Sequence, residues 1–426
     1  MLGDALAKSL FDQICHMPTV DAHEHLHAEE MRVARKVDIF LLFHQYLFTQ
    51  LIAAGMDPKK ANALGIECAV DPRKAGPQDA DAISLDEKWE AIAPYLDLVR
   101  TCSCARPPLE ALKQFFGEDD LTKDNYARIS ARMQEHNRPG LFSRCLRDAC
   151  NIVLVLNQNR TMWQNEMFKP ILPEDNFIAV RDRAAIEALA KEVGGNVADA
   201  LPQFTEQMDA LLTRRVREGM IGVKGVCYVY SPGDKQAASS AYQNILSGRG
   251  TGADQAALAN HLRDRLYEMC GKLGIVVVKH SGVWAGGWSD QTTIRPTHLI
   301  PVAIKHRQTR FDLFHAGTPW PADTGLMARG LPNVWLNLCW SHLISPALAD
   351  QALDIWLDMV PINRVIAFGG DYWWAVENVY GALRQTQEIV ATVLARRIRQ
   401  GSFNEARALD IAKRWFHDSP RELYRV

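Results

Sequence analysis

The sequence lacks several features that would assign it to particular classes of protein. It has nine cysteines but no CxxC motif, and Cys102 and Cys104 are too close together for a zinc-knuckle pair. We therefore interpret the cysteines as reduced thiols that mostly pack. No uncharged apolar stretch approaches the roughly 20 residues of a membrane span. Residues 1–11 carry Asp4 and Lys8 and have no apolar signal-peptide core. These absences predict a cytoplasmic protein without a membrane partner.

An excess of charge of one sign is also missing. Lys and Arg number 48 and Asp and Glu 50, and no long run of either sign occurs. This balance argues against a nucleic-acid partner and against a polybasic membrane patch. Hydrophobic residues make up 47% of the 426 residues, which is enough for a large core. We expect a small-molecule partner and a homo-oligomer.

Short β-rich runs recur along the chain, and most are followed by a longer helical pattern. Such alternation predicts βαβ units and a parallel sheet. An eighth strand could lie near Tyr95–Val99, where the pattern fits a helix equally well. Eight units would form a (β/α)8 TIM barrel, an α/β fold, with residues 1–426 as a single domain. The seven clear runs are 19–22, 152–156, 221–228, 275–278, 311–314, 334–338 and 365–368.

The segment between the first two β-rich runs is mostly helical in pattern, especially at residues 38–53, 84–99 and 108–116. We expect a helical insertion after strand 1, at about residues 28–145, packed beside the barrel mouth. A last long helix is expected at residues 375–400, because apolar residues recur there near helical spacing and Gly401 suits the position after a helix end.

Two histidines follow the first predicted strand, in the sequence Asp21-Ala22-His23-Glu24-His25. Side chains two residues apart in a strand share one face, so His23 and His25 can bind one metal ion. Asp21 has the same parity and could orient an imidazole through its second nitrogen. An HxH motif alone is equally compatible with ordinary core or surface histidines.

Other predicted strands also end in a residue that can bind metal. The run at 275–278 leads to His280, the run at 311–314 to His315, and the run at 365–368 to Asp371. A barrel places its active site at the C-terminal ends of its strands. Four histidines and one aspartate at four strand ends therefore predict a metal centre.

These motifs resemble those of the amidohydrolase superfamily. The resemblance extends from Asp21 to the C-terminus and is most specific in residues 21–25, 315–320 and 370–371. Residues 368–426 look like the end of the branch that includes nodulin-like domains fused to glutamine synthetase. Residues 89–129 are similar to the helical region of uronate isomerases, which belong to the same superfamily.

The resemblance implies His23, His25, His280 and Asp371 as ligands of one divalent metal. Zinc is the leading candidate, and manganese and iron are alternatives. His315 would bind a second metal or act on the substrate. Lys224 lies in the fourth predicted strand, where some members carry a carbamylated lysine that bridges two metals. An ion pair with a nearby carboxylate is the interpretation we favour for Lys224, whereas Lys279 should face the helix layer.

The leading hypothesis for function is hydrolysis of a C–N or C–O bond in a small carboxylate-bearing metabolite by metal-activated water. Asp371 would take the proton of the water and pass it to the leaving group, and His315 would stabilise the developing oxyanion or donate a proton. Arg295, Trp284 and Trp320 are candidates for binding the substrate. Non-oxidative decarboxylation and aldose–ketose isomerisation are alternatives on the same metal site, and a non-catalytic metal-binding protein is a fourth.

Overall fold

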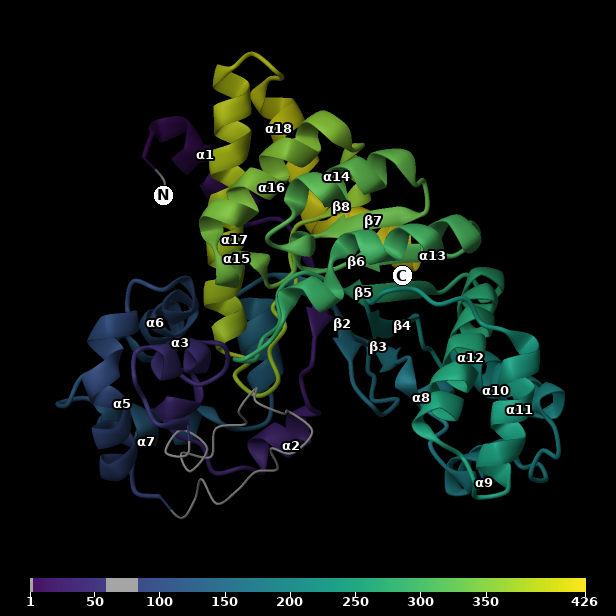
Figure 1. The fold of residues 1–426 in the computed structure, drawn as a ribbon. Coiled ribbons are helices and arrows are strands. Elements are labelled where there is room, and N and C mark those ends of the chain that lie inside the picture. Colours follow the sequence, from purple (N-terminus) through teal and green to yellow (C-terminus); the bar gives the residue numbers. More distant parts are fainter. Residues whose placement is uncertain (1–2, 59–82) are drawn as a thin grey trace.

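The computed structural model describes residues 3–58 and 83–426, and eight parallel strands form the centre of its fold (Figure 1). Neighbouring strands pair in chain order, from β1 to β8. Backbone hydrogen bonds join the segment that follows the last strand back to the first strand, including those from Ala22 N to Phe368 O (3.1 Å) and from Asp371 N to His23 O (2.9 Å). The predicted (β/α)8 barrel is confirmed. Its strands are β1 (Thr19–Glu24), β2 (Ile152–Gln158), β3 (Phe168–Pro173), β4 (Gly222–Val226), β5 (Val276–His280), β6 (Arg310–Leu313), β7 (Val334–Asn337) and β8 (Val365–Ile366).

The seven clear β-rich runs of the sequence are all strands, and each end lies within two residues of its expected position. They are mostly apolar because helices cover the outer face of a parallel barrel and side chains fill its interior. The long segments between the strands form the helices that cover this outer face (Figure 1).

The remaining strand is not where the sequence suggested it. Tyr95–Val99 is the end of helix α5, and the missing strand is β3 (Phe168–Pro173). This run contains Pro170 and Pro173, which lack the N–H group that a strand usually donates. Pro170 still accepts a hydrogen bond through its carbonyl oxygen from Ile221 N (3.1 Å). The two prolines explain why the sequence pattern did not indicate a strand at this place.

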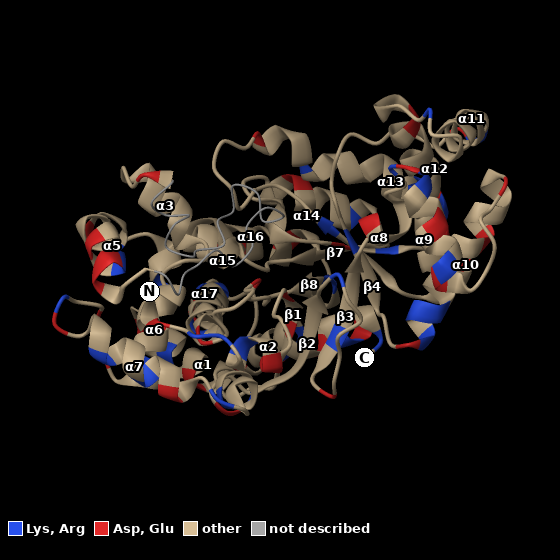
Figure 2. Ribbon diagram, turned by 90° about the horizontal axis from the view of Figure 1, so that it is seen from below, with Lys and Arg blue, Asp and Glu red and all other residues tan. Residues whose placement is uncertain are grey.

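The helices of the expected insertion form a lobe at one flank of the barrel, opposite α9 to α12 (Figures 1 and 2). Residues 59–82 of this segment lie outside the described residues. The lobe contains α2 (Glu29–Val33), η1 (Ile39–Leu41), α3 (Leu47–Ala53), α5 (Leu85–Val99), η3 (Ser103–Ala105), α6 (Arg106–Ala111), η4 (Leu112–Phe116), α7 (Tyr126–His136) and η5 (Ser143–Asp148).

Residues 38–53 are not one helix, as their pattern had suggested. The short helix η1 ends at Leu41, and Tyr46 has a left-handed backbone (φ 70°) directly before α3 begins. The lobe also packs tightly on the barrel: a Cβ atom added to Gly381 of α17 would lie 2.5 Å from Pro107 Cα of α6. Glycine is needed at this close approach of two helices.

The other helices surround the barrel, and α17 begins three residues later than expected. Gly401 follows the end of α17 with φ 76°, as predicted. These helices are α1 (Ala5–Ile14), α8 (Asp175–Ile178), α9 (Arg183–Val193), α10 (Leu201–Arg217), α11 (Lys235–Leu246), α12 (Gly252–Leu273), η6 (Gln291–Ile294), η7 (Pro296–His298), α13 (Leu299–Lys305), η8 (His315–Gly317), α14 (Pro321–Gly330), α15 (Ser341–Ile344), α16 (Pro346–Met359), η9 (Ile362–Arg364), α17 (Asn378–Arg399), α18 (Glu405–Lys413), η10 (Arg414–Asp418) and α19 (Ser419–Tyr424).

The last helix, α19, closes the end of the barrel where the strands begin. Tyr424 donates a hydrogen bond to Asp312 (2.7 Å) in the barrel interior. Arg310, the first residue of β6, donates to the carbonyl oxygen of Leu423. We call this closed end the floor, and the opposite end, where the strands finish, the mouth.

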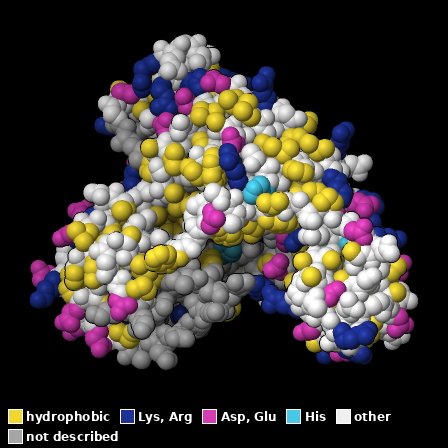
Figure 3. All heavy atoms as spheres, viewed as in Figure 1, with side chains coloured by type: hydrophobic (Ala, Val, Ile, Leu, Met, Phe, Trp, Pro, Cys, Tyr) yellow, Lys and Arg dark blue, Asp and Glu magenta, His cyan; other side chains and the backbone are white. Residues whose placement is uncertain are grey.

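The surface has no broad region of one charge on the faces shown in Figures 2 and 3, where basic and acidic side chains are interspersed. A hollow lies between the lobe of the insertion and helices α9 to α12 in Figure 3, and histidine is visible in it. Over residues 3–58 and 83–426, no helix combines the length and the apolar character needed to cross a membrane.

Candidate functional site

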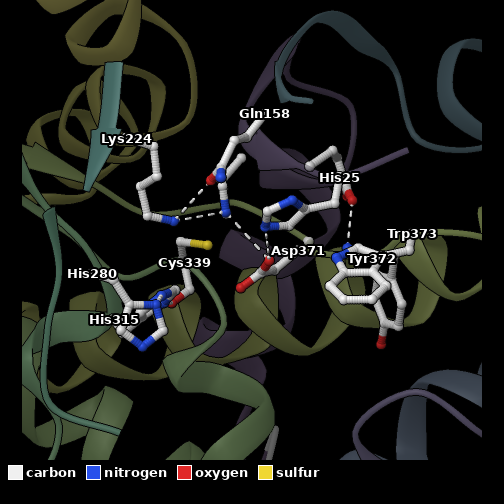
Figure 4. A network of polar contacts seen from close by, with 12 residues as sticks. His25, Gln158, Lys224, His280, His315, Cys339, Asp371, Tyr372 and Trp373 are labelled. Carbon is white, nitrogen blue, oxygen red and sulfur yellow. Dashed lines mark hydrogen bonds and ion pairs between the residues drawn. The ribbon is translucent and has the colours of Figure 1, made fainter. Parts of the chain in front are cut away.

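Polar side chains from seven of the eight strands converge toward the mouth of the barrel (Figure 4). Most of these side chains lie at or just beyond the C-terminal end of their strand, whereas Lys224 lies within β4. This is where a parallel barrel can place groups from distant parts of the sequence side by side. The residues are His23 and His25 from β1, Gln158 from β2, Lys224 from β4, His280 from β5, His315 after β6, Cys339 after β7 and Asp371 after β8.

Three of the four predicted metal ligands lie together. The Nε2 atoms of His23 and His25 are 3.3 Å and 3.2 Å from Asp371 Oδ1. Burial by itself would raise the pKa of Asp371, but the two imidazoles hold it well below its ordinary value. Two imidazole nitrogens and a carboxylate, all within 4.8 Å of one another, are a donor set that fits a divalent cation.

His280 lies apart from that group and is paired with His315. The outer ring nitrogens each face a carbonyl oxygen, His280 Nε2 at 2.8 Å from Val283 O and His315 Nδ1 at 2.9 Å from Cys339 O. Carbonyl oxygens only accept hydrogen bonds, so each outer nitrogen carries the hydrogen. The inner nitrogens, His315 Nε2 and His280 Nδ1, are 2.9 Å apart.

These inner nitrogens therefore present two lone pairs to each other. Burial, aided by the charge of Lys224, lowers the pKa of His280 to about 3. Burial and the neighbouring His280 hold the pKa of His315 well below its ordinary value. Two neutral imidazoles in this arrangement repel each other unless a cation lies between them. This second donor pair also fits a metal ion.

Lys224 lies in the barrel interior. Its Nζ atom is 3.3 Å from His23 Nε2 and 3.1 Å from Gln158 Oε1. Within the described part of the chain, no carboxylate oxygen lies within 4.0 Å of it, so the expected ion pair is wrong. Burial lowers the pKa of Lys224, although the charge of Asp371 opposes this effect. Lys279 faces the helix layer as predicted, and its Nζ atom is 3.2 Å from Glu174.

Asp21 and Glu24 bind backbone rather than imidazole. Asp21 Oδ1 accepts hydrogen bonds from the N atoms of His23 and Gly370, both at 3.2 Å. Glu24 Oε2 accepts one from Tyr372 N (2.6 Å). The expected contact between Asp21 and a ligand imidazole is therefore not made. Instead, these buried carboxyl groups tie β1 to the loop that carries Asp371, and burial raises the pKa of Asp21 to about 7.

The backbone at the mouth is strained. His315 and Asp371 both have φ 66°, and Trp340, directly after Cys339, has φ 61°. Non-glycine residues in this left-handed region cost about 1–3 kcal/mol each, and such residues concentrate at functional sites. The strain supports a functional role for these strand ends.

The helical insertion also contributes to the site. Gln45 Nε2 donates a hydrogen bond to Asp371 O (2.8 Å), and Gln45 Oε1 accepts one from Trp373 N (2.9 Å). The hydroxyl of Tyr46 donates to the same oxygen of Asp371. Sequence reasoning missed Gln45 and Tyr46 because they lie in a segment read as one regular helix. The loop of Asp371 is thus held by β1 on one side and by the insertion on the other.

The predicted substrate-binding residues separate into two places. Trp284 stacks on His280, with ring centroids 5.1 Å apart. Arg295 is 46% exposed, pairs with Asp323 (3.0 Å) and lies over the ring of Trp320 (5.2 Å). The structure therefore places Trp284 against the imidazole of His280, whereas Arg295 and Trp320 contact each other.

The sequence matches the model of one protein family. A family model described as amidohydrolase matches residues 174–426. Comparison with curated protein sequences finds no match.

Solved structures resemble the whole chain. The uronate isomerase of Thermotoga maritima is 15% identical, with a TM-score of 0.78 and coverage of 98% of this chain and 97% of the other. The glucuronate isomerase of Caulobacter crescentus is 16% identical, with a TM-score of 0.76 and coverage of 99% and 94%. A protein from Lactobacillus casei described as a metal-dependent hydrolase is 14% identical, with a TM-score of 0.62 and coverage of 98% and 97%. At these identities the likeness shows a shared fold.

Proposed function

The chain belongs to the amidohydrolase family of metal-dependent enzymes, and from that premise we propose that it interconverts the aldose and ketose forms of a small sugar acid. A uronate, a sugar that carries a carboxylate, is the proposed substrate class. One divalent ion is the proposed cofactor.

One observation carries the choice of reaction. Gln45 and Tyr46 of the insertion donate hydrogen bonds to the main-chain oxygen of Asp371. The insertion therefore forms part of the site. The fold matches that of uronate isomerases over 98% and 99% of the chain, which includes this insertion. The hydrolase from Lactobacillus casei covers the chain equally, at 98%, so the choice of isomerisation is supported by the higher TM-scores of the two isomerases, 0.78 and 0.76 against 0.62.

His23, His25 and Asp371 are the residues that would hold the ion, with zinc as the leading candidate and manganese and iron as alternatives. When bound, a divalent cation at this place polarises a carbonyl or hydroxyl oxygen of the substrate. His280 remains a predicted ligand, although it lies with His315 in this structure.

Asp371 is the proposed proton carrier. An aldose–ketose conversion removes a proton from one carbon and delivers it to its neighbour, and a carboxylate can do both. The neighbouring imidazoles keep Asp371 ionised and thus able to accept a proton. His315 is the second proposed proton-transfer group. One of its ring nitrogens lies within 4.8 Å of the Asp371 carboxylate, and the ring is oriented by the carbonyl oxygen of Cys339.

Lys224 is the proposed partner of the substrate carboxylate. A buried ammonium without a carboxylate nearby is costly, and an anionic substrate would compensate it. Arg295, the residue expected for this role from the sequence, already pairs with Asp323. Trp284 is the proposed apolar wall, since it stacks on His280.

Hydrolysis of a C–N or C–O bond is the second candidate. The hydrolase from Lactobacillus casei matches 98% of the chain, although with a lower TM-score of 0.62. In that reaction Asp371 would accept a proton from the attacking water and pass it to the leaving group. The same residues would hold the metal.

A substrate panel separates these candidates. The metal-loaded protein would be incubated with hexuronates, lactones, amides and aromatic acids, and the products identified by chromatography and mass spectrometry. Isomerisation predicts a product with the mass of the hexuronate and a new retention time, absent with the Asp371→Asn variant. Products that have gained water from a lactone or amide, with no hexuronate turnover, would reject isomerisation in favour of hydrolysis.

A further inference from the structure

We propose that His315, Cys339 and Asp371 form a second cation site that prefers soft ions such as zinc and cadmium, and that filling it inhibits the enzyme. The site lies beside the group formed by His23, His25 and Asp371 and shares its carboxylate. The second site could exist whether the enzyme catalyses isomerisation or hydrolysis.

The three residues come from three neighbouring strands. His315 follows β6, Cys339 follows β7 and Asp371 follows β8, and one ligand atom of each lies within 4.8 Å of the other two. His315 and Cys339 are fully buried, and Asp371 is 6% exposed. In Figure 4, the sulfur of Cys339 lies among Lys224, His315 and Asp371. A nitrogen, a sulfur and an oxygen therefore surround one small volume.

The Cys339 sulfur packs against Gly369, where only a residue without a side chain leaves enough space for it. A Cβ atom added to Gly369 would lie 2.9 Å from both Cβ and Sγ of Cys339, and 3.1 Å from His23 Cβ. Any side chain at Gly369 would push Cys339 away from β8 and β1. Among the described residues, the Cys339 sulfur makes no hydrogen bond. A cation that binds the sulfur displaces the thiol proton to the solvent.

His315 is held so that it offers a lone pair. Its Nδ1 atom faces the carbonyl oxygen of Cys339 at 2.9 Å and carries the hydrogen, which leaves Nε2 unprotonated. His280 Nδ1 lies 2.9 Å from this nitrogen and presents a second lone pair. A cation would remove the repulsion between the two nitrogens and would gain the sulfur of Cys339 and the carboxylate of Asp371.

The sulfur of Cys339 determines which metal ions the second site prefers. Thiolate ligands favour zinc and other soft cations, whereas manganese and magnesium prefer oxygen. The group of His23, His25 and Asp371 has no sulfur and can accept either kind. Asp371 belongs to both groups. An ion at the second site would therefore bind the carboxylate that is proposed to carry the proton, and that carboxylate could no longer accept one. Excess soft metal should therefore inhibit an enzyme that manganese supports.

Cadmium alone serves as the probe. The manganese-loaded protein would be titrated with cadmium chloride while the ultraviolet sulfur-to-cadmium absorption is recorded. The initial rate would be measured in parallel. We expect about one cadmium per chain to produce the absorption, with loss of activity over the same range. Cys339→Ser should remove the absorption and raise the inhibiting cadmium concentration ~10-fold or more.

Cys270→Ser is the matched control, because Cys270 is equally buried but lies in α12. It should behave like the wild type. The absorption should also persist in a His23→Ala/His25→Ala variant, which the proposed function predicts to be inactive, so the two proposals can fail separately. Cys339→Ala replaces Cys339→Ser if the serine variant does not fold.

An undiminished absorption in the Cys339 variant would overturn the proposal. X-ray absorption at the cadmium edge of the wild-type protein gives a test without any variant. One sulfur bound to cadmium is expected, and cadmium surrounded only by nitrogen and oxygen would also overturn the proposal.

Discussion

Two buried aspartates lie in the same barrel, one hydrogen-bonded to α19 at the floor and one at the mouth, and their pKa values are shifted in opposite directions. At the floor, Asp312 accepts hydrogen bonds from Asn337 (3.0 Å) and Tyr424 (2.7 Å), and burial raises its pKa to about 7. At the mouth, Asp371 is also deeply buried, yet the imidazoles of His23 and His25 hold its pKa well below its ordinary value.

The difference lies in the partners. Neutral dipoles at the floor stabilise a carboxyl group that closes the barrel and need not be charged. At the mouth, the imidazoles of His23 and His25 face the carboxylate and stabilise its charged form. We therefore expect substitutions at the mouth to change metal binding and turnover, and substitutions at the floor to change stability and its pH dependence.

The largest effect is expected from removing both histidines of β1. His23→Ala/His25→Ala should reduce the manganese content of the manganese-loaded protein from about one ion per chain to almost none and abolish turnover, because two of the three ligands disappear. The barrel should remain folded, since its core does not depend on the ion. Metal analysis and circular dichroism measure the two properties. Full metal content in the double variant would show that the ion binds elsewhere.

Next in size is the effect of Asp371→Asn. Asparagine keeps the shape and one ligand oxygen but cannot accept a proton at neutral pH, so kcat should fall ~10²-fold or more while much of the metal remains. Asp312→Asn is the matched control at the floor and should turn over nearly normally. Near-normal turnover of Asp371→Asn would move the proton transfer to another residue, and His315 would be tested next.

The two lysines of neighbouring strands provide a third test. Lys279→Met leaves Glu174 with one cation fewer and should lower the free energy of unfolding by about 1–3 kcal/mol. Lys224→Met removes an ammonium that has no ion pair with any described residue, so stability should be unchanged or higher. It should instead raise KM for a carboxylate-bearing substrate.

Denaturant unfolding and steady-state kinetics distinguish these outcomes for the two lysine variants. A larger loss of stability in Lys224→Met than in Lys279→Met would contradict the proposed roles. Rescue of a Lys224→Ala variant by short carboxylic acids would point instead to a carbamylated lysine that bridges two metals.

The last test concerns pH and the floor. The pKa of Asp312 is about 7 in the folded protein and about 4 in an unfolded chain. Its contribution to stability is therefore complete below about pH 4 and is lost as the pH rises through 7, by up to ~1.4 kcal/mol per pH unit. Asp312→Asn lacks this loss, so its stability relative to the wild type should increase over that range and then level off.

Unfolding of both proteins across this pH range, monitored by circular dichroism, measures the difference. Other titrating groups contribute to both proteins and cancel in the comparison. A difference that does not change with pH would mean that Asp312 is ionised in the folded state.

The sequence by itself determined the barrel and most of the residues at its mouth. Apolar runs mark strands, and His23, His280 and Asp371 stand at or beyond the ends of three of them. Because all strands of a parallel barrel end at one face, a residue's place at a strand end was enough to predict that it belongs to the site. The two prolines of β3 show the limit of this reasoning.

Only the tertiary structure decided which of these groups touch. It paired His280 with His315, left Lys224 without a carboxylate and placed the sulfur of Cys339 beside Asp371. It also brought Gln45 and Tyr46 from the insertion to the loop of Asp371. Contacts of about 3 Å depend on loop paths and on backbone angles such as φ 66° at Asp371, which residue spacing along a chain does not encode.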